Sequence, residues 1–157
     1  MNIEIKRATA ADVKDILRLL GLVLEVHHKG RPDIFKTGAV KYTEQELQGL
    51  LADEKRPIMV AKSDGRMLGY VFCIIKETKD DNILKDMKTL YIDDLCVDEN
   101  ERGGGIGRAL YEHAKAYAKK IGCYNLTLNV WECNASAKRF YESMGLTPRN
   151  TLMETIL

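Results

Sequence analysis

Four of the five residues from position 103 to 107 are glycine, in the run Gly103-Gly104-Gly105-Ile106-Gly107. This run follows an apolar, strand-like segment at 90–97 and precedes an amphipathic helix pattern. Glycine costs backbone entropy, so a cluster of it beside a helix start indicates a close approach of the main chain to another group. Because a helix N-terminus presents unpaired N–H groups and a positive dipole end, a phosphate suits that position. A plain flexible turn is the alternative.

Two common nucleotide-binding motifs do not fit this turn. A P-loop requires Gly-Lys-Ser or Gly-Lys-Thr after its glycines, whereas Gly107 is followed by Arg108 and Ala109. The dinucleotide pattern G-x-G-x-x-G requires a third glycine where this chain has Arg108 or Leu110. A switch protein that binds a mononucleotide is therefore disfavoured.

The hydrophobic pattern along the whole chain predicts an α/β (α+β) fold. With 157 residues, 45% of them hydrophobic, we expect a single domain over 1–157 with one buried core. Period-two segments predict strands at 3–5, 57–61, 67–75, 90–97, 126–130 and 151–157, and apolar spacings of three and four predict helices at 9–24, 43–51, 106–121 and 134–144. Segment 27–42 is expected to be a loop or a broken helix. The order βααβββαβαβ favours a mixed sheet covered by helices.

Composition excludes several kinds of partner. The chain has 24 basic and 23 acidic residues, so its net charge of +1 gives no reason to expect nucleic acid. Its four cysteines form no C-x-x-C pair, and we expect neither a metal site nor a dithiol motif. The N-terminus lacks the apolar core of a signal peptide, and no segment approaches the ~20 apolar residues of a membrane span. We therefore expect a reduced, cytoplasmic protein with no membrane partner.

The residues around the turn resemble a known family. Arg102-x-x-Gly105-x-Gly107 is similar to the pyrophosphate-binding turn Q/R-x-x-G-x-G/A of the GNAT superfamily of N-acetyltransferases. Upstream, the segment 92–97, Ile-Asp-Asp-Leu-Cys-Val, resembles the splayed fourth strand of that family. Downstream, the segment 126–146 resembles its second signature, with Asn-x-x-Ala-x-x-Phe-Tyr-x-x-x-Gly-Leu at its end. Small-molecule and polyamine acetyltransferases have the most similar motifs.

This resemblance implies a fold, a reaction and a set of site residues. The fold is a three-layer GNAT arrangement, with a mostly antiparallel sheet of about six to seven strands and about four flanking helices. The reaction transfers the acetyl group of acetyl-CoA to a primary amine by direct attack in a ternary complex, without a metal. The implied coenzyme contacts are Leu95, Cys96, Val97, Arg102, Gly103, Gly104, Gly105, Ile106, Gly107, Arg108, Asn134 and Tyr141. Dimers are common in the family, so a homodimer is compatible with the resemblance.

The resemblance also assigns chemical roles. Main-chain N–H groups near Leu95 to Val97 would stabilise the developing oxyanion, and Tyr141 would protonate the leaving thiolate. Helical spacing alone places Tyr141 in an apolar stripe with Phe140, so a core position is the alternative. Asn134 stands where a helix cap is expected, a role compatible with a coenzyme contact.

Asp93 and Asp94 are adjacent carboxylates inside an apolar strand, which opposes strand propensity. Regular alternation places them on opposite faces, so one is expected in a cleft, beside a base or in solvent. Members of the superfamily often have Glu on this strand to accept the proton of the amine, and polyamine acetyltransferases carry Glu-Asp at these positions. Asp93 is therefore the candidate general base, directly or through water, with a structural role as the alternative.

The identity of the acceptor amine stays open, and both small molecules and peptides are compatible with the resemblance. In the family, the loop between the first two helices shapes the amine site, and here that loop includes His28, Arg31, Asp33 and Phe35. His28 is either a second base or a surface histidine. A non-catalytic module that binds acetyl-CoA is the alternative function, disfavoured because the recognisable catalytic positions are present.

Overall fold

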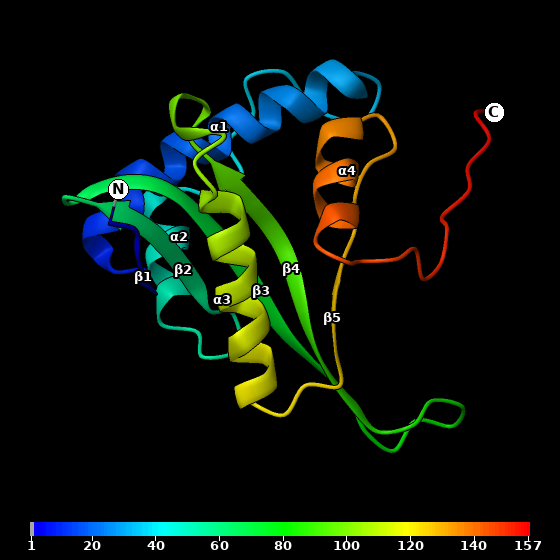
Figure 1. Ribbon diagram of the computed structural model, residues 1–157. Coiled ribbons are helices and arrows are strands. Elements are labelled where there is room, and N and C mark those ends of the chain that lie inside the picture. The colour runs from blue at the N-terminus through cyan, green and yellow to red at the C-terminus, as the bar shows by residue number, and fades with distance from the viewer. Residues whose placement is uncertain (1) are drawn as a thin grey trace.

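A computed structural model describes residues 2–157 and shows one mixed sheet with helices on both faces (Figure 1). The elements in chain order are β1 (Glu4–Arg7), α1 (Val13–Gly30), α2 (Glu44–Leu51), β2 (Ile58–Ser63), β3 (Arg66–Thr78), β4 (Met87–Val97), α3 (Ile106–Lys120), β5 (Asn125–Leu128) and α4 (Ala135–Ser143). Short 3-10 turns, η1 (Ala10–Asp12) and η2 (Glu99–Glu101), precede α1 and α3. The strands lie in the order β1-β2-β3-β4-β5, and every pair is antiparallel except β4–β5.

Local sequence signals start the first two helices. The main-chain N–H of Thr9 donates to the carboxylate of Asp12 over 2.8 Å, just ahead of α1. Thr43 and Glu46 form the reciprocal capping box of α2, with bonds of 3.1 and 2.8 Å. Helix α1 continues to Gly30, so the loop expected from position 27 begins later. Its last turn carries His27, His28 and Lys29, which suit the negative end of the helix dipole.

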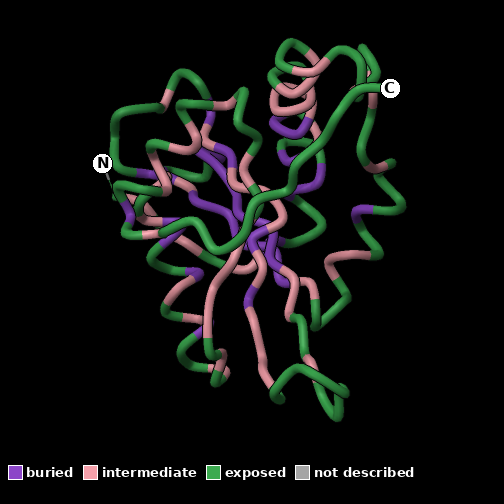
Figure 2. Tube along the Cα trace, turned by 90° about the vertical axis from the view of Figure 1, so that its right-hand side faces the viewer, coloured by how far each residue is buried: buried purple, intermediate pink, exposed green. Residues whose placement is uncertain are grey.

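Each face of the sheet has its own hydrophobic core. On one face, apolar strand residues pack against α3 through Leu110 and Ala114. On the other face, they pack against α1 and α2 through Ile16, Leu19 and Leu47. Figure 2 shows the buried residues concentrated along the strands, with exposed segments around them. These packed helix and sheet layers confirm the predicted fold class.

The predicted strand count is wrong, because the sheet of the described residues has five strands rather than six or seven. The expected last strand at 151–157 has no regular secondary structure and is exposed along its length. Residues 147–157 run outward beyond α4 instead of turning back to the sheet (Figure 1). Thr147 precedes Pro148, and a residue before proline favours extended backbone, which opposes a tight return.

A β-bulge interrupts the ladder between β3 and β4. Phe72 pairs with Asp94, whereas the next residue, Cys73, pairs with Ile92, so Asp93 is the extra residue of β4. A bulge shifts the alternation of side chains by one position, and regular alternation therefore fails here.

The shift places both carboxylates on the α1 side of the sheet. Asp94 accepts a hydrogen bond from Tyr70, a residue of the α1-side core. Asp93 pairs with Lys41, from the loop between α1 and α2. The prediction that the two acids point to opposite faces is therefore wrong, because an unpaired extra residue separates the two halves of β4.

Candidate active site

Strand β5 pairs along its whole length, but only with the first half of β4. Their pairing begins at Thr89 with Asn125 and ends at Ile92 with Leu128. Figure 1 shows the two strands diverging beyond that point. Within residues 2–157, the second half of β4 therefore has no strand partner on the β5 side, up to Val97. Main-chain groups in such a gap are available to a ligand.

The glycine-rich turn lies between β4 and α3 and adopts a backbone that favours glycine. Gly103 has φ of 85° and Gly105 has φ of 78°, and a Cβ on either would meet nothing within 4 Å. Both positions thus favour glycine because of their positive φ, and not because neighbouring atoms would clash with a side chain. Gly105 is the N-cap of α3 and makes no side-chain cap, and the first turn of α3 contains no acidic residue. The exposed N–H groups at this helix start are therefore suited to an anion.

The other residues of the turn have different surroundings. A Cβ on Gly107 would lie 3.3 Å from the Phe140 ring and 3.5 Å from Val97, so this glycine permits close packing of α4. The side chain of Ile106 is buried in the α3-side core and holds the first turn of α3 against the sheet. Gly104, Arg102 and Arg108 are exposed; the two arginines flank the turn, where they can meet an anion.

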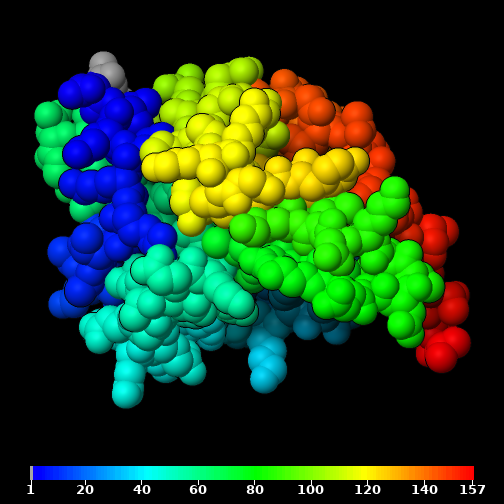
Figure 3. All heavy atoms as spheres, turned by 90° about the horizontal axis from the view of Figure 1, so that it is seen from below, coloured from blue at the N-terminus to red at the C-terminus, as the bar shows by residue number. Residues whose placement is uncertain are grey.

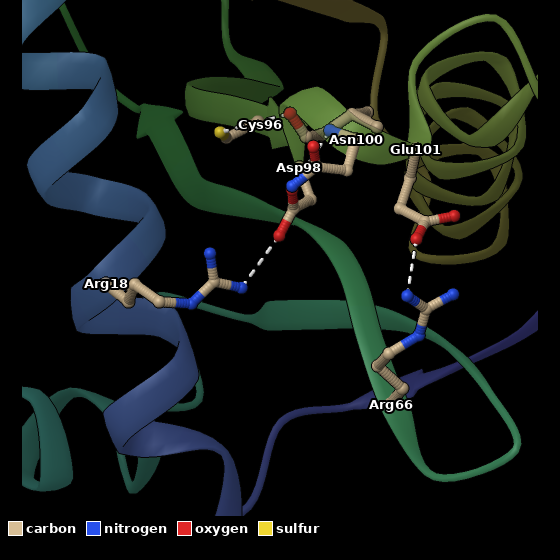
Figure 4. A network of polar contacts seen from close by, with 7 residues as sticks. Arg18, Arg66, Cys96, Asp98, Asn100 and Glu101 are labelled. Carbon is tan, nitrogen blue, oxygen red and sulfur yellow. Dashed lines mark hydrogen bonds and ion pairs between the residues drawn. The ribbon is translucent and has the colours of Figure 1, made fainter.

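Two ion pairs hold the segment just ahead of the turn (Figure 4). Arg18 of α1 donates to Asp98 over 2.8 Å, and Arg66 of β3 lies 2.7 Å from Glu101. The Arg18 guanidinium keeps the pKa of Asp98 below its usual range, and Asp98 also accepts the N–H of Asn100 over 3.1 Å. Anchors from α1 and β3 thus fix both ends of η2. No sequence motif signals these pairs, since their members are far apart in the chain.

Asp94 is a half-buried carboxylate on the α1 side of the sheet. The Tyr70 hydroxyl donates to it over 2.7 Å. Burial raises the pKa of Asp94, and the hydrogen bond from Tyr70 and the charge of Lys41 oppose this only in part. His27, at the end of α1, interacts with the same carboxylate, and burial lowers the pKa of this imidazole. Asp94 and a neutral His27 are thus both placed to receive a proton.

Asp93, the predicted base, is engaged by a cation. Lys41 Nζ donates to Asp93 Oδ2 over 3.0 Å, and both side chains are about a quarter to a third exposed. Burial alone would lower the pKa of Lys41, but its bond to Asp93 and the negative charges around it together outweigh burial and raise the pKa. Asp93 also lines a small apolar hollow with Tyr42 and Phe72. The bulge thus brings Asp93 and Asp94 to one site in different environments.

Tyr141 lies on α4, close to the diverging strands. Its ring is half-buried and packs edge-on to Phe140, with centroids 5.2 Å apart. Burial raises the pKa of Tyr141, and the negative charge of Asp94 adds to the effect. The phenol is therefore protonated at neutral pH and lies within electrostatic range of Asp94. Asn134 caps α4 by accepting the Ala137 N–H over 3.2 Å, which confirms the predicted cap.

Cys96 is the cysteine beside this group, and it is buried. Burial raises the pKa of its thiol to about 12. A thiol that stays protonated at neutral pH is a poor nucleophile, so Cys96 is not suited to carry an acyl group.

Two loops meet beside the end of α1. His28 Nδ1 lies 2.8 Å from the carbonyl oxygen of Phe35, and this contact orients the imidazole toward its own loop. Phe35 packs edge-on to Trp131, with centroids 5.1 Å apart. A Cβ on Gly30 would lie 2.6 Å from the sulfur of Cys133, so α1 ends tightly against the loop that precedes α4. The loop after α1 thus forms one wall with the segment that carries Asn134.

Comparison with known proteins identifies this arrangement. The profile of the Acetyltransferase (GNAT) family matches residues 23–146. The chain belongs to the GNAT acetyltransferase family. This acetyltransferase is 33% identical over 143 residues to a protein of Archaeoglobus fulgidus named as an uncharacterized N-acetyltransferase, covering 91% of this chain and 92% of that protein.

Solved structures agree with this assignment. A mutant of the BH1408 protein from Bacillus halodurans is 34% identical to the acetyltransferase, with a TM-score of 0.94 over 98% of this chain and 99% of that chain. An aminoglycoside acetyltransferase, meta-AAC0020, from an uncultured soil metagenomic sample shares the fold, with 22% identity, a TM-score of 0.75, and coverage of 99% and 95%. The protein is thus an acyltransferase.

The family generally uses acetyl-CoA, and the site of this acetyltransferase fits that coenzyme. Gly103 and Gly105 leave an open, left-handed turn at an uncapped helix start, as a pyrophosphate requires. The gap beside β4 exposes main chain where a thioester can lie. Within residues 2–157, no three His, Cys, Asp or Glu side chains come together as a metal site. In the same range, no helix has the length and apolar character needed to cross a bilayer.

Sequence reasoning missed Asp94 and His27 as site residues. The two adjacent carboxylates in an apolar strand did indicate an unusual position. The pattern of side chains along one strand does not reveal a bulge, however, and the bulge is what places Asp94 beside Asp93. His27 lies in a segment expected to be irregular, and its position depends on the extension of α1 to Gly30.

Proposed function

We propose that this acetyltransferase moves the acetyl group of acetyl-CoA directly to a primary amine while both substrates are bound. The observation that carries the proposal is the joint position of the glycine turn beside the half of β4 that has no partner on the β5 side. The residues that would hold the coenzyme are those predicted from the resemblance: Leu95, Cys96, Val97, Arg102, Gly103, Gly104, Gly105, Ile106, Gly107, Arg108, Asn134 and Tyr141. The high pKa of the Cys96 thiol favours direct transfer over an acyl-enzyme route.

Removal of a proton from the amine is the first task of the site. An alkylamine with a pKa of about 10.4 is almost wholly charged at neutral pH, and its neutral form costs about 4–5 kcal/mol there. A carboxylate of raised pKa is a stronger base than an ordinary one. We propose that Asp94, with His27 beside it, accepts this proton directly or through water. Asp93, the candidate from the sequence, would then neutralise Lys41 and leave the site without a free positive charge that would repel the amine.

Stabilisation of the developing charges is the second task. Acetyl-CoA supplies the thioester, whose carbonyl oxygen becomes negative as the amine nitrogen attacks. The main-chain N–H groups near Leu95 to Val97 would donate to that oxygen. Tyr141 would donate its proton to the leaving sulfur, since its raised pKa keeps the phenol protonated.

We propose that the acceptor is a small cationic amine. An amine of a peptide is the alternative acceptor. Asp93 and Asp94 on one side of the sheet favour a positive charge. Solved structures that share the fold include an aminoglycoside acetyltransferase in complex with sisomicin and a glucosamine-6-phosphate N-acetyltransferase from Arabidopsis thaliana. Their names point to amine acceptors of small size. We further propose that residues 1–157 act as one domain, in the cytoplasm, as a homodimer.

The test is release of free coenzyme A thiol from acetyl-CoA with a panel of polyamines, aminoglycosides, amino sugars and peptide N-termini. We expect turnover with at least one small amine, and a loss of about 10²-fold or more in kcat for Tyr141→Phe. Tyr124→Phe is the matched control, because Tyr124 is 77% exposed and should leave kcat unchanged. Coenzyme binding without turnover on any acceptor, or full activity of Tyr141→Phe, would contradict the proposal.

A further inference from the structure

Asp98 is a buried acid at the junction between β4 and the glycine turn. It is 8% exposed and directly follows Val97, the last residue of β4. A buried carboxylate needs hydrogen bonds and a countercharge to offset the loss of its hydration. Close to a diphosphate, the charge of an acid also repels the ligand. The position of Asp98 therefore indicates a task in the structure that outweighs this repulsion.

Hydrogen bonds tie Asp98 to three elements of the fold. Its N–H donates to the carbonyl oxygen of Leu68 in β3 over 2.9 Å, and its own carbonyl accepts the N–H of Glu101 over 2.9 Å. One carboxylate oxygen accepts the N–H of Asn100 over 3.1 Å and caps η2. The other oxygen accepts a bond of 2.8 Å from the guanidinium of Arg18. Asp98 thus joins β3, η2 and α1 (Figure 4).

Strand β3 approaches the main chain closely just ahead of Asp98. A Cβ on Gly69 would lie 2.5 Å from the carbonyl oxygen of Cys96 and 3.2 Å from the Cα atom of Val97. This glycine therefore lets β3 pass against the end of β4, and its neighbour Leu68 holds the N–H of Asp98. The start of η2 is fixed from the β3 side by the main chain and from the α1 side by Arg18.

We propose that Asp98 and Arg18 are positioning residues for the coenzyme. Together they would hold η2 in the orientation in which the following glycine turn presents its N–H groups to the diphosphate. A 3-10 turn of three residues has few hydrogen bonds of its own, so its orientation depends on such anchors. A turn that is already ordered loses less entropy on binding and holds its ligand more tightly. This inference rests on the proposed coenzyme site, and neither side chain has to touch the coenzyme.

Positioning differs from simple neutralisation of charge in the sign of one effect. If Arg18 did no more than compensate for the charge of Asp98, removal of the acid would strengthen binding of the anionic coenzyme. Positioning requires the bond between the two residues, so removal of either partner weakens binding. The direction of the change at Asp98 therefore distinguishes the two roles.

The test is the Kd for coenzyme A, measured by isothermal titration calorimetry on the full-length protein. We expect Arg18→Met and Asp98→Asn each to raise the Kd by about 3- to 10-fold, although they change the net charge in opposite directions. Asparagine has one acceptor oxygen in place of two, so it can keep the cap on Asn100 but not both bonds. Asp98→Ala loses the cap as well and should bind more weakly still. Arg18→Lys keeps the charge and should keep most of the affinity.

Lys79→Met is the matched control. Lys79 pairs with Glu77 over 3.3 Å, and its loss changes the net charge as Arg18→Met does. The β3–β4 loop, residues 79–86, contributes to the face shown in Figure 3, where it is green. The 11 residues of β4 separate this loop from Asp98 by roughly 30 Å. The Kd for coenzyme A should be unchanged in this variant.

Thermal unfolding without ligand shows whether a variant affects the fold alone. A lower Tm with an unchanged Kd in Arg18→Met, or equal or tighter binding in Asp98→Asn, would overturn the inference. An unmodified chain without affinity for coenzyme A would overturn the proposed function itself. Should Asp98→Ala fail to fold by circular dichroism, Arg18→Met and Asp98→Asn decide the matter.

Discussion

The hydroxyl of Tyr70 on β3 donates a 2.7 Å hydrogen bond to the carboxylate of Asp94 on β4. The two residues belong to neighbouring strands, and the register pairs Tyr70 with Cys96 and Phe72 with Asp94. Burial raises the pKa of Asp94, whereas the hydrogen bond stabilises its charged form and lowers the pKa. The basicity of Asp94 therefore depends on the opposing effects of burial and of the hydrogen bond from the Tyr70 hydroxyl.

Removal of that hydroxyl should shift the pH dependence of catalysis. In Tyr70→Phe, Asp94 loses a donor to its charged form, so its pKa rises and the acidic limb of kcat/KM moves to higher pH. Activity well above that limb should be largely retained. The measurement is a pH–rate profile, and Tyr111→Phe serves as control because Tyr111 is buried in the other core. An unchanged acidic limb would show that Asp94 does not control it.

The two carboxylates of the bulge should differ in their contribution to catalysis. We expect Asp94→Asn to lower kcat by about 10²–10⁴-fold, as loss of a general base does. Asp93→Asn should mainly raise KM, since it leaves the positive charge of Lys41 uncompensated and so opposes binding of a cationic amine. Steady-state kinetics on the best acceptor from the amine panel measures both effects. The reverse ranking would return the role of base to Asp93.

The glycine turn should be sensitive to any side chain that its backbone does not tolerate. Gly105→Val places a β-branched residue at φ of 78°, where L-residues are strained by roughly 1–2 kcal/mol, and it adds bulk at the proposed phosphate site. We expect a large loss of thermal stabilisation by coenzyme A. Gly65→Val is the matched control, with φ of 77° in the β2–β3 turn. It should show similar strain but normal coenzyme binding. Equal stabilisation of the two variants by coenzyme A would exclude the turn as the binding site.

A buried ion pair makes the stability of the fold depend on pH. Asp12 is only 1% exposed and pairs with Lys62 of β2. Burial alone would raise the pKa of Asp12, but the bonds from Lys62 and Thr9 lower it overall. The stabilisation is therefore complete above the unfolded carboxyl pKa of about 3.9 and is lost as the pH falls through the lower folded value. The pKa of Asp98 is also lowered in the folded protein, so Asp98 likewise contributes stability that is lost on acidification.

Lys62→Met tests this interpretation. Without its partner, the buried Asp12 carboxylate should cost about 3–5 kcal/mol of unfolding free energy at neutral pH. Burial then raises the pKa of Asp12, so part of the loss should be recovered on mild acidification, opposite to the unmodified chain. Urea unfolding across that pH range measures both curves. A parallel loss at every pH would mean that Lys62 stabilises the fold by packing alone.

The sequence predicted those features that depend on local chemistry. The caps at Thr43 and Asn134 and the strand–turn–helix unit around Gly105 are encoded by neighbouring residues, and the structure has all three. The Asp64-Gly65 turn likewise has positive φ at both residues, as a tight hairpin requires. Each of these features needs only a few consecutive side chains.

Features that depend on distant contacts could not be predicted from the sequence. The Arg18–Asp98 pair joins residues that only the fold brings together. The segment at 151–157 has the composition of a strand, but it is exposed and joins no strand of the sheet in the described residues. The bulge at Asp93 depends on register between β3 and β4, which the pattern of one strand does not contain.

The extra residue in β4 also affects the basicity of Asp94. In a regular strand, side chains on one face are two residues, or about 7 Å, apart along the chain. Here two acids that are consecutive in the chain share one face, with Lys41 attracted to both of them. The negative charge of Asp93 adds to burial in raising the pKa of Asp94, so a change of charge at one residue of the bulge alters the basicity of the other.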